Sequence, residues 1–228
     1  MLSIIDHRIP EIAKEKLSKY FELVELPSST ETYESISAHP DIFFCKTNDA
    51  LIYAPNIDNN IINILEKKGV SLIKGKSSIG KKYPESAYYN ALITENHLIH
   101  NIKFTDPSIL GITAGLEQIK VNQGYTRCNL IGLSENLFLT SDLGIHQILL
   151  EQKLNSFFIN PEKIHLSGFK NGFFGGCCGF YENRLFVLGS LKYITEQDEL
   201  KKNLEKNNIE IVELFNGPLF DGGSIIII

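Results

Sequence analysis

The chain ends with Asp221-Gly222-Gly223-Ser224-Ile225-Ile226-Ile227-Ile228, and this stretch decides the fold. Its apolar part is far shorter than the roughly 20 residues needed to cross a bilayer, so it predicts a buried β-strand over Ser224–Ile228. No later segment is available to pair with this strand. The first predicted strand, Leu2–Asp6, is also rich in isoleucine. We therefore expect the two terminal strands to pair with each other.

A hairpin recurs four times between the termini. Each turn lies between two short apolar runs, and a predicted helix and another strand follow it. The four turns are Thr47-Asn48-Asp49, Thr94-Glu95-Asn96, Ser134-Glu135-Asn136 and Tyr181-Glu182-Asn183. Together with the terminal strands they make five units at intervals of roughly 40 to 47 residues, a period typical of ring and solenoid arrays.

Hydrophobic patterns and turn residues set the bounds of the expected elements. The predicted strands cover residues 2–6, 21–26, 41–45, 51–54, 70–73, 87–93, 98–100, 119–121, 128–133, 137–140, 156–159, 178–181, 185–188, 209–214 and 224–228. Helix starts are expected at Pro10, Asp58, Asp106-Pro107, Ser141 or Asp142, and a capping box at Thr195–Asp198. The polar segment Ser28–Pro40 is expected on the surface.

Two architectures are compatible with alternating strands and helices. The simpler one is an ordinary α/β sheet. The regular hairpins and a final strand without a following helix favour a ring instead, because a ring pairs the terminal strands and leaves no exposed edge. We predict a single domain over residues 1–228, and its 43% hydrophobic content is sufficient for a sizeable core.

Composition restricts the class of partner. The net charge is −5 and no basic run occurs, so nucleic acid and anionic membranes are not expected as partners. Neither a signal peptide nor a transmembrane segment is expected. The four cysteines lack zinc-site spacing, which predicts free thiols, a cytoplasmic protein and no metal. No dinucleotide or Walker fingerprint indicates a cofactor. Frequent Ile, Asn and Lys suggest a bacterial source, and the sequence leaves the oligomeric state open.

Short motifs spread over the chain resemble the pentein fold, a five-bladed α/β propeller of ββαβ units. The fold is that of guanidino-group-modifying enzymes (deiminases, dimethylarginine hydrolases and amidinotransferases) and of a non-catalytic ribosome anti-association factor. More closely, the chain resembles an uncharacterised bacterial family assigned this fold. The matching segments are Ile4-Ile5-Asp6 with Arg8 and Pro10, Thr140-Ser141-Asp142 with Gly144-Ile145, Gly175-Gly176-Cys177, and Gly217-Pro218-Leu219 with Asp221 and Gly223-Ser224-Ile225-Ile226.

The resemblance departs from the catalytic members at one position. Those enzymes carry a cysteine on the last hairpin, after a Gly-Gly-x-Asn-Ile-like run. The corresponding run here places Ile227 at that position, and no cysteine follows Cys178. An aliphatic side chain cannot form the covalent amidino intermediate that a thiolate forms. The resemblance therefore implies the fold without its usual nucleophile.

Cys177 and Cys178 are the candidates for a displaced nucleophile, within the Gly175–Gly179 run that the resemblance implies lines the central channel. The alternative is that both are small packed residues, since free cysteine is among the most buried types. His146 is the candidate base, with His100 at the corresponding strand end one unit earlier. The alternative for His146 is a position on a helix surface.

Five polar residues are candidates for binding a ligand at one end of the channel. Asp6, Arg8, Asp142 and Asp221 are expected to cluster there if the ring closes, with Ser141 beside Asp142. Carboxylates in this position suit a cationic guanidinium or amine. The alternatives are an N-cap role for Ser141 and Asp142 and, for the other residues, an ion-pair network that closes the ring.

Three functions remain compatible with the sequence. The first is binding of a small cationic, guanidino-like or amino-acid-like ligand without catalysis. The second is a guanidino-modifying hydrolase or amidinotransferase that uses a displaced cysteine. The third is a non-catalytic protein-interaction module. Ile227 favours the non-catalytic functions, because it removes the expected nucleophile.

Overall fold

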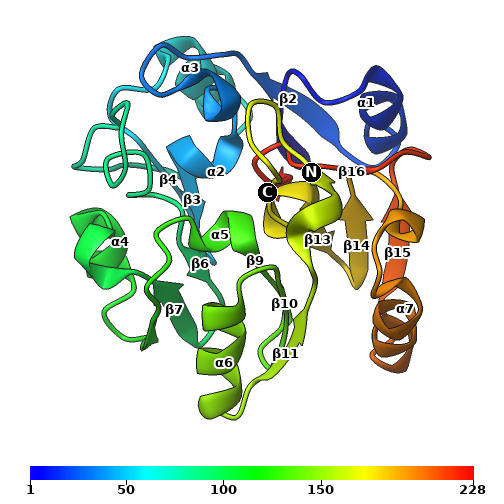
Figure 1. Ribbon diagram of the computed structural model, residues 1–228. Coiled ribbons are helices and arrows are strands. Elements are labelled where there is room, and N and C mark those ends of the chain that lie inside the picture. The colour runs from blue at the N-terminus through cyan, green and yellow to red at the C-terminus, as the bar shows by residue number, and fades with distance from the viewer.

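The computed structural model describes all residues 1–228, and the strands form six sheets (Figure 1). Five of the sheets have three strands in a common arrangement. In each, the first strand runs antiparallel to the middle strand, and the middle strand runs parallel to the third. We call these the inner, middle and outer strands.

Each of the five sheets consists of an inner, a middle and an outer strand, and the middle strands succeed one another along the chain. In that order the sheets are β17 (Ile226–Ile227), β1 (Leu2–Asp6) and β2 (Glu22–Leu26); β3 (Phe44–Lys46), β4 (Leu51–Tyr53) and β5 (Leu72–Lys74); β6 (Leu92–Ile93), β7 (His97–His100) and β8 (Glu117–Lys120); β9 (Leu130–Ser134), β10 (Leu137–Thr140) and β11 (Asn155–Phe158); and β13 (Cys178–Tyr181), β14 (Arg184–Val187) and β15 (Glu210–Glu213). The sixth sheet pairs β12 (Ile164–His165) with β16 (Leu219–Phe220) in parallel.

Helices occupy two kinds of position. The helices at the periphery of Figure 1 are α1 (Glu11–Leu17), α3 (Asn59–Lys67), α4 (Pro107–Ile112), α6 (Leu143–Glu151) and α7 (Gln197–Lys206). The short helices α2 (Pro40–Phe43) and α5 (Thr126–Asn129) lie near the middle and lead directly into inner strands. The 3₁₀ turns are η1 (Glu34–Ile36), η2 (Ile102–Phe104), η3 (Pro161–Lys163), η4 (Gly175–Cys177) and η5 (Leu191–Tyr193).

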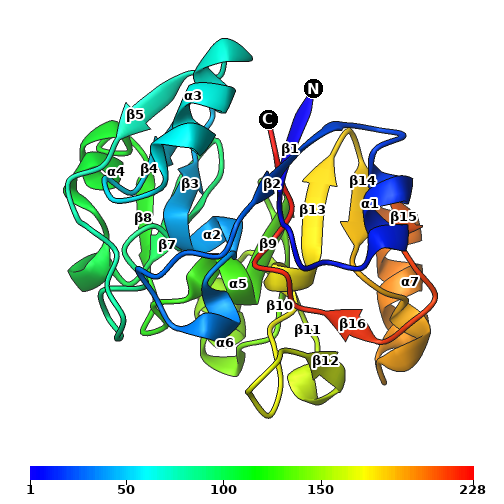
Figure 2. The same ribbon diagram turned by 90° about the horizontal axis from the view of Figure 1, so that it is seen from above.

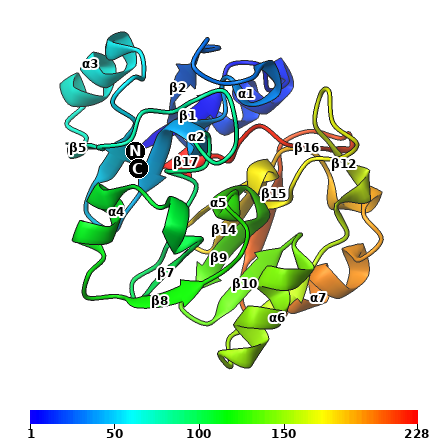
Figure 3. The ribbon, with the colours of Figure 1, turned by 60° about the vertical axis from the view of Figure 1, so that its left-hand side comes forward.

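The two ends of the chain meet in one sheet. Strand β1 pairs antiparallel with β17, with Ser3 opposite Ile227 and Ile4 opposite Ile226. Two further hydrogen bonds join the backbones of Leu2 and Ile228, at 2.8 and 2.9 Å. Both termini consequently lie side by side in all three views (Figures 1–3). Every residue of β1 is buried, including the polar Ser3 and Asp6, which agrees with its content of leucine and isoleucine.

Peripheral helices cover the sheets with apolar faces, as their sequence pattern requires. In α3, Ile61, Ile62 and Leu65 are buried, and Asp58 caps the helix by accepting a hydrogen bond from Asn60 N at 2.9 Å. Asp106 caps α4 in the same way. The predictions of these two caps are confirmed.

Several predicted elements differ from the structure. The strands expected over 41–45 and 128–133 begin later, because α2 and α5 take up their first residues, and the strand expected over 87–93 is reduced to β6. The segment Ser28–Pro40 is not wholly a surface connection, since residues 36–40 are buried. The prediction of a capping box before α7 is wrong, because the N-cap residue of α7 is Glu196 and its side chain makes no capping hydrogen bond. Strands β12 and β16 were not predicted.

Candidate functional site

A group of buried ionisable side chains gathers where the middle strands end and the inner strands begin. Asp6 is the last residue of β1, and Asp221 precedes the Gly-Gly turn that leads to β17. His39 and Asp41 flank the start of α2. All four side chains are at most 2% exposed. Charged groups are rarely buried so completely without partners, so their contacts decide what the site can do.

Close backbone packing holds these residues together. The backbone N–H of Asp41 donates to the carbonyl of Gly223 at 3.1 Å, which joins α2 to the turn before β17. Gly223 has a positive φ of 67°, and a Cβ at this position would lie 2.1 Å from the Cβ of His39. Only glycine allows this approach. The Gly-Gly pair therefore brings the turn that follows Asp221 into direct contact with His39 and with the start of α2.

Asp6 is neutralised by Arg8. The guanidinium donates through Nε at 3.0 and 3.1 Å and through Nη2 at 2.6 Å to the two carboxylate oxygens. Arg8 also donates to the carbonyls of Glu34 and Ser35, at 2.7 and 3.1 Å. This bidentate pair ties β1 to the segment that carries His39, so Arg8 is engaged with the protein itself.

His39 lies between two carboxylates. Its Nε2 is 3.9 Å from Asp6 Oδ2, and its Nδ1 is 3.9 Å from Asp221 Oδ1. Both separations are too long for hydrogen bonds. Nδ1 is buried and has no hydrogen-bond partner. The imidazole thus keeps an unused polar atom inside the site.

Asp221 is a buried carboxylate with an unusual protonation equilibrium. Burial raises its pKa to about 6, with the charge of Asp41 adding to the rise and His39 opposing it. The N–H groups of Phe173 and Gly223 donate to its oxygens at 2.8 and 3.1 Å and favour the ionised form. Asp221 therefore changes its charge within the physiological pH range.

Asp41 belongs to a second buried network. Its Oδ2 accepts hydrogen bonds from Cys128 Sγ at 3.1 Å and from Ser224 Oγ, while its Oδ1 has no partner. Asn90 donates to Cys128 Sγ at 3.0 Å and accepts from the Cys128 N–H at 3.0 Å. Burial, reinforced by the charge of Asp41, raises the pKa of Cys128 far above its usual range. Cys128 is consequently a protonated thiol that donates to Asp41.

Asp221 and His39 line a cavity of about 100 Å³, which we call the acidic cavity, whereas Asp6 and Asp41 lie outside its wall. His39, Cys128, Asn171 and Asp221 form its polar part. Its remaining wall is mainly aromatic and apolar and includes Tyr33, Tyr125, Phe169, Phe173, Ile36, Ile42 and Leu166. Burial raises the pKa of both Tyr33 and Tyr125, so both phenols are neutral at physiological pH. The cavity combines a titrating carboxylate with several aromatic side chains.

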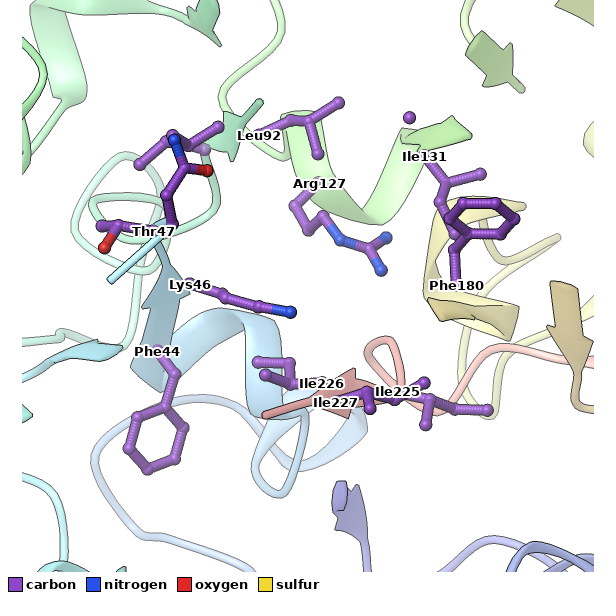
Figure 4. Close-up of a pocket in the computed structure, with 14 residues that line it drawn as sticks. Phe44, Lys46, Thr47, Leu92, Arg127, Ile131, Phe180, Ile225, Ile226 and Ile227 are labelled. Atoms are coloured by element: carbon purple, nitrogen blue, oxygen red, sulfur yellow. The ribbon is translucent and has the colours of Figure 1, made fainter. Parts of the chain in front are cut away.

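A second and larger cavity, of about 340 Å³, lies among the inner strands, and we call it the central cavity (Figure 4). The lining residues come from the inner strands of all five three-stranded sheets: Phe44 and Lys46, Leu92 and Ile93, Ile131 and Gly132, Phe180, and Ile226 and Ile227. Arg127, from α5, also lines it. Ile227 thus faces a cavity that contains no thiol, carboxylate or histidine.

The structure places Cys177 and Cys178 in an apolar cluster rather than in either cavity. Both are fully buried and pack with residues such as Leu185, Leu191 and Leu219. Cys177 Sγ lies 3.3 Å from the carbonyl of Phe173, and no histidine contacts either sulfur. Burial raises the pKa of both thiols. A protonated, inaccessible thiol is a poor nucleophile.

The structure does not bring the candidate histidines to these cysteines. His146 Nδ1 is 2.9 Å from Ser156 Oγ on β11, and His146 is half-buried. His100 is fully buried, and its two ring nitrogens lie 2.7 Å from Thr105 Oγ1 and 2.8 Å from the carbonyl of Gly124. Burial lowers its pKa to about 4, so it is a neutral structural residue.

The ligand candidates divide into two groups. Asp6, Arg8 and Asp221 lie together around His39. Asp142 instead caps α6 by accepting from Ile145 N at 2.8 Å, and it lines neither cavity. Ser141 is buried and bonds to Asn129 Oδ1 at 3.1 Å and to the Phe174 N–H at 3.0 Å. Its hydroxyl is therefore occupied within the core.

Sequence reasoning missed His39, Asp41 and Cys128. His39 lay in a segment expected on the surface, and the other two lay in predicted strands. The sequence did contain one signal for this network. Polar residues stand two or three positions before three of the inner strands, namely Asp41, Cys128 and Ser224.

No cluster of His, Cys, Asp or Glu forms a metal-binding group. None of the helices has the length and hydrophobicity that crossing a bilayer requires.

Comparison with solved structures shows that the α/β fold of the chain is pentein-like. Dimethylarginine dimethylaminohydrolase from Pseudomonas aeruginosa, complexed with citrulline, superposes with a TM-score of 0.53 and 12% identity over 93% of this chain and 91% of that chain. The amidinotransferase SxtG from Microseira wollei gives 0.51 and 11%, over 92% and 87%. Agmatine deiminase from C. jejuni gives 0.51 and 14%, over 92% and 75%.

At these identities the similarity establishes the α/β fold and nothing further. The sequence itself matches a family described as one of unknown function (DUF6873) over residues 4–226, so the chain belongs to that family. A search of curated proteins found no match. The resemblance to an uncharacterised family with the pentein fold is therefore confirmed.

Proposed function

We propose that this protein is a five-bladed pentein that binds a small cationic, guanidinium-like ligand in the acidic cavity without catalysing its modification. The observation that carries the proposal is the buried, titrating carboxylate of Asp221 in a cavity walled by Tyr33, Tyr125 and Phe169. The buried thiols support a reducing, cytoplasmic location, since all four cysteines are unpaired.

Several contacts support closure of the five sheets into a ring. Inner strands of neighbouring sheets contact each other in four places: β3 contacts β6, β6 contacts β9, β9 contacts β13, and β13 contacts β17. The remaining junction, between the sheets of β17 and β3, contains the hydrogen bond from Asp41 N to the carbonyl of Gly223. The pairing of β1 with β17 joins the two ends of the chain in one blade. Such closure removes the exposed sheet edges.

Charge and shape favour a cation in the acidic cavity. Asp221 is the one carboxylate that lines the cavity, and it forms no ion pair with a lysine or arginine. The Nδ1 atom of His39, which also lines the cavity, is buried without a partner. A guanidinium or alkylammonium group supplies hydrogen-bond donors to a carboxylate and is attracted to aromatic faces. A volume of about 100 Å³ suits a group of that size.

The surroundings of the cysteines support binding without catalysis. The resemblance implies that Ile227 takes the position of the nucleophile in catalytic penteins, and Ile227 lines the central cavity. Cys177 and Cys178 are packed in apolar surroundings. Cys128 lines the acidic cavity, but its raised pKa keeps it protonated and hydrogen-bonded to Asp41. No thiol is therefore prepared for attack on a guanidino carbon.

Calorimetric titration with methylguanidinium chloride at pH 7.5 tests the proposal, with urea as the neutral analogue of similar shape. We expect methylguanidinium to bind and urea not to bind. Asp221→Asn removes the charge and is expected to weaken binding by at least about 10-fold, the size of a typical charge-assisted hydrogen bond. Tyr33→Leu removes one aromatic face and is expected to weaken binding by a smaller factor.

Tyr193→Leu is the matched control, because Tyr193 is exposed and lines neither cavity. Equal affinity of the wild type and Asp221→Asn for methylguanidinium would overturn the proposal, as would equal binding of urea. Incubation with arginine, agmatine and dimethylarginine, followed by assay for citrulline or ureido products, separates binding from catalysis. Turnover by the wild type would refute the non-catalytic assignment.

A further inference from the structure

Two cationic side chains line the central cavity, and none of its lining residues is acidic. Lys46 and Arg127 extend toward the same space from different walls (Figure 4). No aspartate or glutamate lines the cavity, and neither cation lies within 4.0 Å of a carboxylate. Two like charges that face the same cavity repel each other, so this arrangement costs folding free energy unless an anion joins it.

The guanidinium of Arg127 retains donors for such an anion. It donates to the carbonyls of Leu130, Gly175 and Cys178, at 3.4, 2.9 and 3.1 Å. A guanidinium has five N–H donors, so two remain without a protein acceptor. The three carbonyls hold the group in place but do not cancel its charge. A fixed guanidinium with free donors is suited to a carboxylate or phosphate.

Lys46 has no competing structural contact. It is the last residue of β3 and is exposed at the cavity, and its ammonium forms no hydrogen bond with the protein. Partial removal of its ammonium from water inside the cavity lowers its pKa, and the neighbouring charge of Arg127 adds to this. Burial lowers the pKa of Arg127, and the charge of Asp41, which does not line this cavity, opposes that shift.

The rest of the cavity wall is apolar. Nine of its 14 lining residues are hydrophobic, and Ile225, Ile226 and Ile227 form one continuous side. An inorganic anion has no apolar surface to bury against such a wall. A ligand with a charged head and an apolar body buries its body against these side chains while its head meets the cations.

We infer that the central cavity is a binding site for a small organic carboxylate, whose carboxylate lies between Arg127 and Lys46 and whose apolar body packs against Ile225–Ile227. The site is separate from the acidic cavity. Successive residues of α5 divide the two, since Arg127 lines the central cavity and Cys128 lines the acidic one. The inference therefore stands independently of the proposed cation site.

Titration of the full chain with sodium hexanoate tests this inference, with hexanamide and inorganic phosphate as comparison probes. We expect hexanoate to bind and neither hexanamide nor phosphate to compete with it. Lys46→Met removes one charge and no internal hydrogen bond, so the variant is expected to fold and to bind hexanoate at least about 10-fold more weakly. Lys74→Met, at an exposed lysine on β5, is the matched control and is expected to bind like the wild type.

A second measurement needs no ligand. Relief of the repulsion between Lys46 and Arg127 is expected to raise the melting temperature of Lys46→Met by about 1–2 °C. Two results would overturn the inference. One is equal affinity of the wild type and Lys46→Met for hexanoate, and the other is equal affinity of the wild type for hexanamide and hexanoate. Tighter binding of phosphate than of hexanoate would overturn the assignment to an organic carboxylate. A lower melting temperature for Lys46→Met than for the wild type would contradict the argument that repulsion between Lys46 and Arg127 destabilises the fold.

Discussion

Replacing Asp221 with asparagine tests whether the buried carboxylate controls the pH dependence of stability. Its pKa is about 6 in the folded protein, against 3.8 for an ordinary aspartate. The folded state therefore binds this proton more tightly than the unfolded state does. Asp221 favours folding below pH 4, and this contribution is lost as the pH rises through 6.

The size of the effect follows from the two pKa values. Between pH 4.5 and 7.5, linkage gives a loss of about 2 kcal/mol from Asp221 alone. In a chain of this length that corresponds to about 4 °C in melting temperature. Asparagine has no such titration. It also loses one of the two hydrogen bonds from Phe173 N and Gly223 N, at a cost of about 1 kcal/mol at every pH.

Urea unfolding of the wild type and Asp221→Asn at pH 4.5 and 7.5 measures this difference. The chain lacks tryptophan and has nine tyrosines, so tyrosine fluorescence and circular dichroism are suitable signals. We expect the variant to gain about 2 kcal/mol relative to the wild type as the pH rises. Asp49→Asn, at an exposed turn residue, is expected to show no such gain. Parallel pH profiles for the wild type and Asp221→Asn would refute the reasoning.

Three further predictions concern other buried groups. All four cysteines are buried and unpaired, so a thiol reagent should label none of them rapidly in the folded protein and all four after denaturation. Rapid labelling of any cysteine in the folded protein would contradict this. Ile227→Ala should lower stability to urea by about 2–4 kcal/mol, against almost nothing for exposed Ile112→Ala, and a loss below about 1 kcal/mol would show that the terminal strand is not tightly packed. His100 has a pKa of about 4, lowered by burial, so the unfolded state binds its proton more tightly and stability falls as the pH drops from 6.5 to 4. An NMR titration of the His100 ring checks this, and a midpoint near 6.5 would contradict it.

Much of the fold could be predicted from local sequence patterns. Short apolar runs on either side of polar turns specify the hairpins, and the strand Leu2–Asp6 has the bounds that its apolar run predicted. Asp58 and Asp106 cap helices because their side chains reach N–H groups two residues ahead. These are interactions between residues close in sequence, so the pattern contains the information needed.

The candidate site could be predicted only in part. Asp6, Arg8 and Asp221 were expected together because the terminal strands were expected to pair, and the structure places them around His39. Asp142 was expected with them, but it caps its own helix instead. That local hydrogen bond competes with any distant partner, and the sequence alone does not rank the two.

Sequence alone determined the repeated hairpins, the two capped helices and the buried terminal strand with isoleucine at position 227. Only the tertiary structure decided which side chains meet. His39, Asp41 and Cys128 come together because short helices and a glycine turn at the starts of different inner strands pack against one another. Arg127 and Lys46 share a cavity for the same reason. Local propensity acts within a few residues, whereas both cavities are built from chain segments far apart in sequence, whose relative placement depends on packing of the whole core.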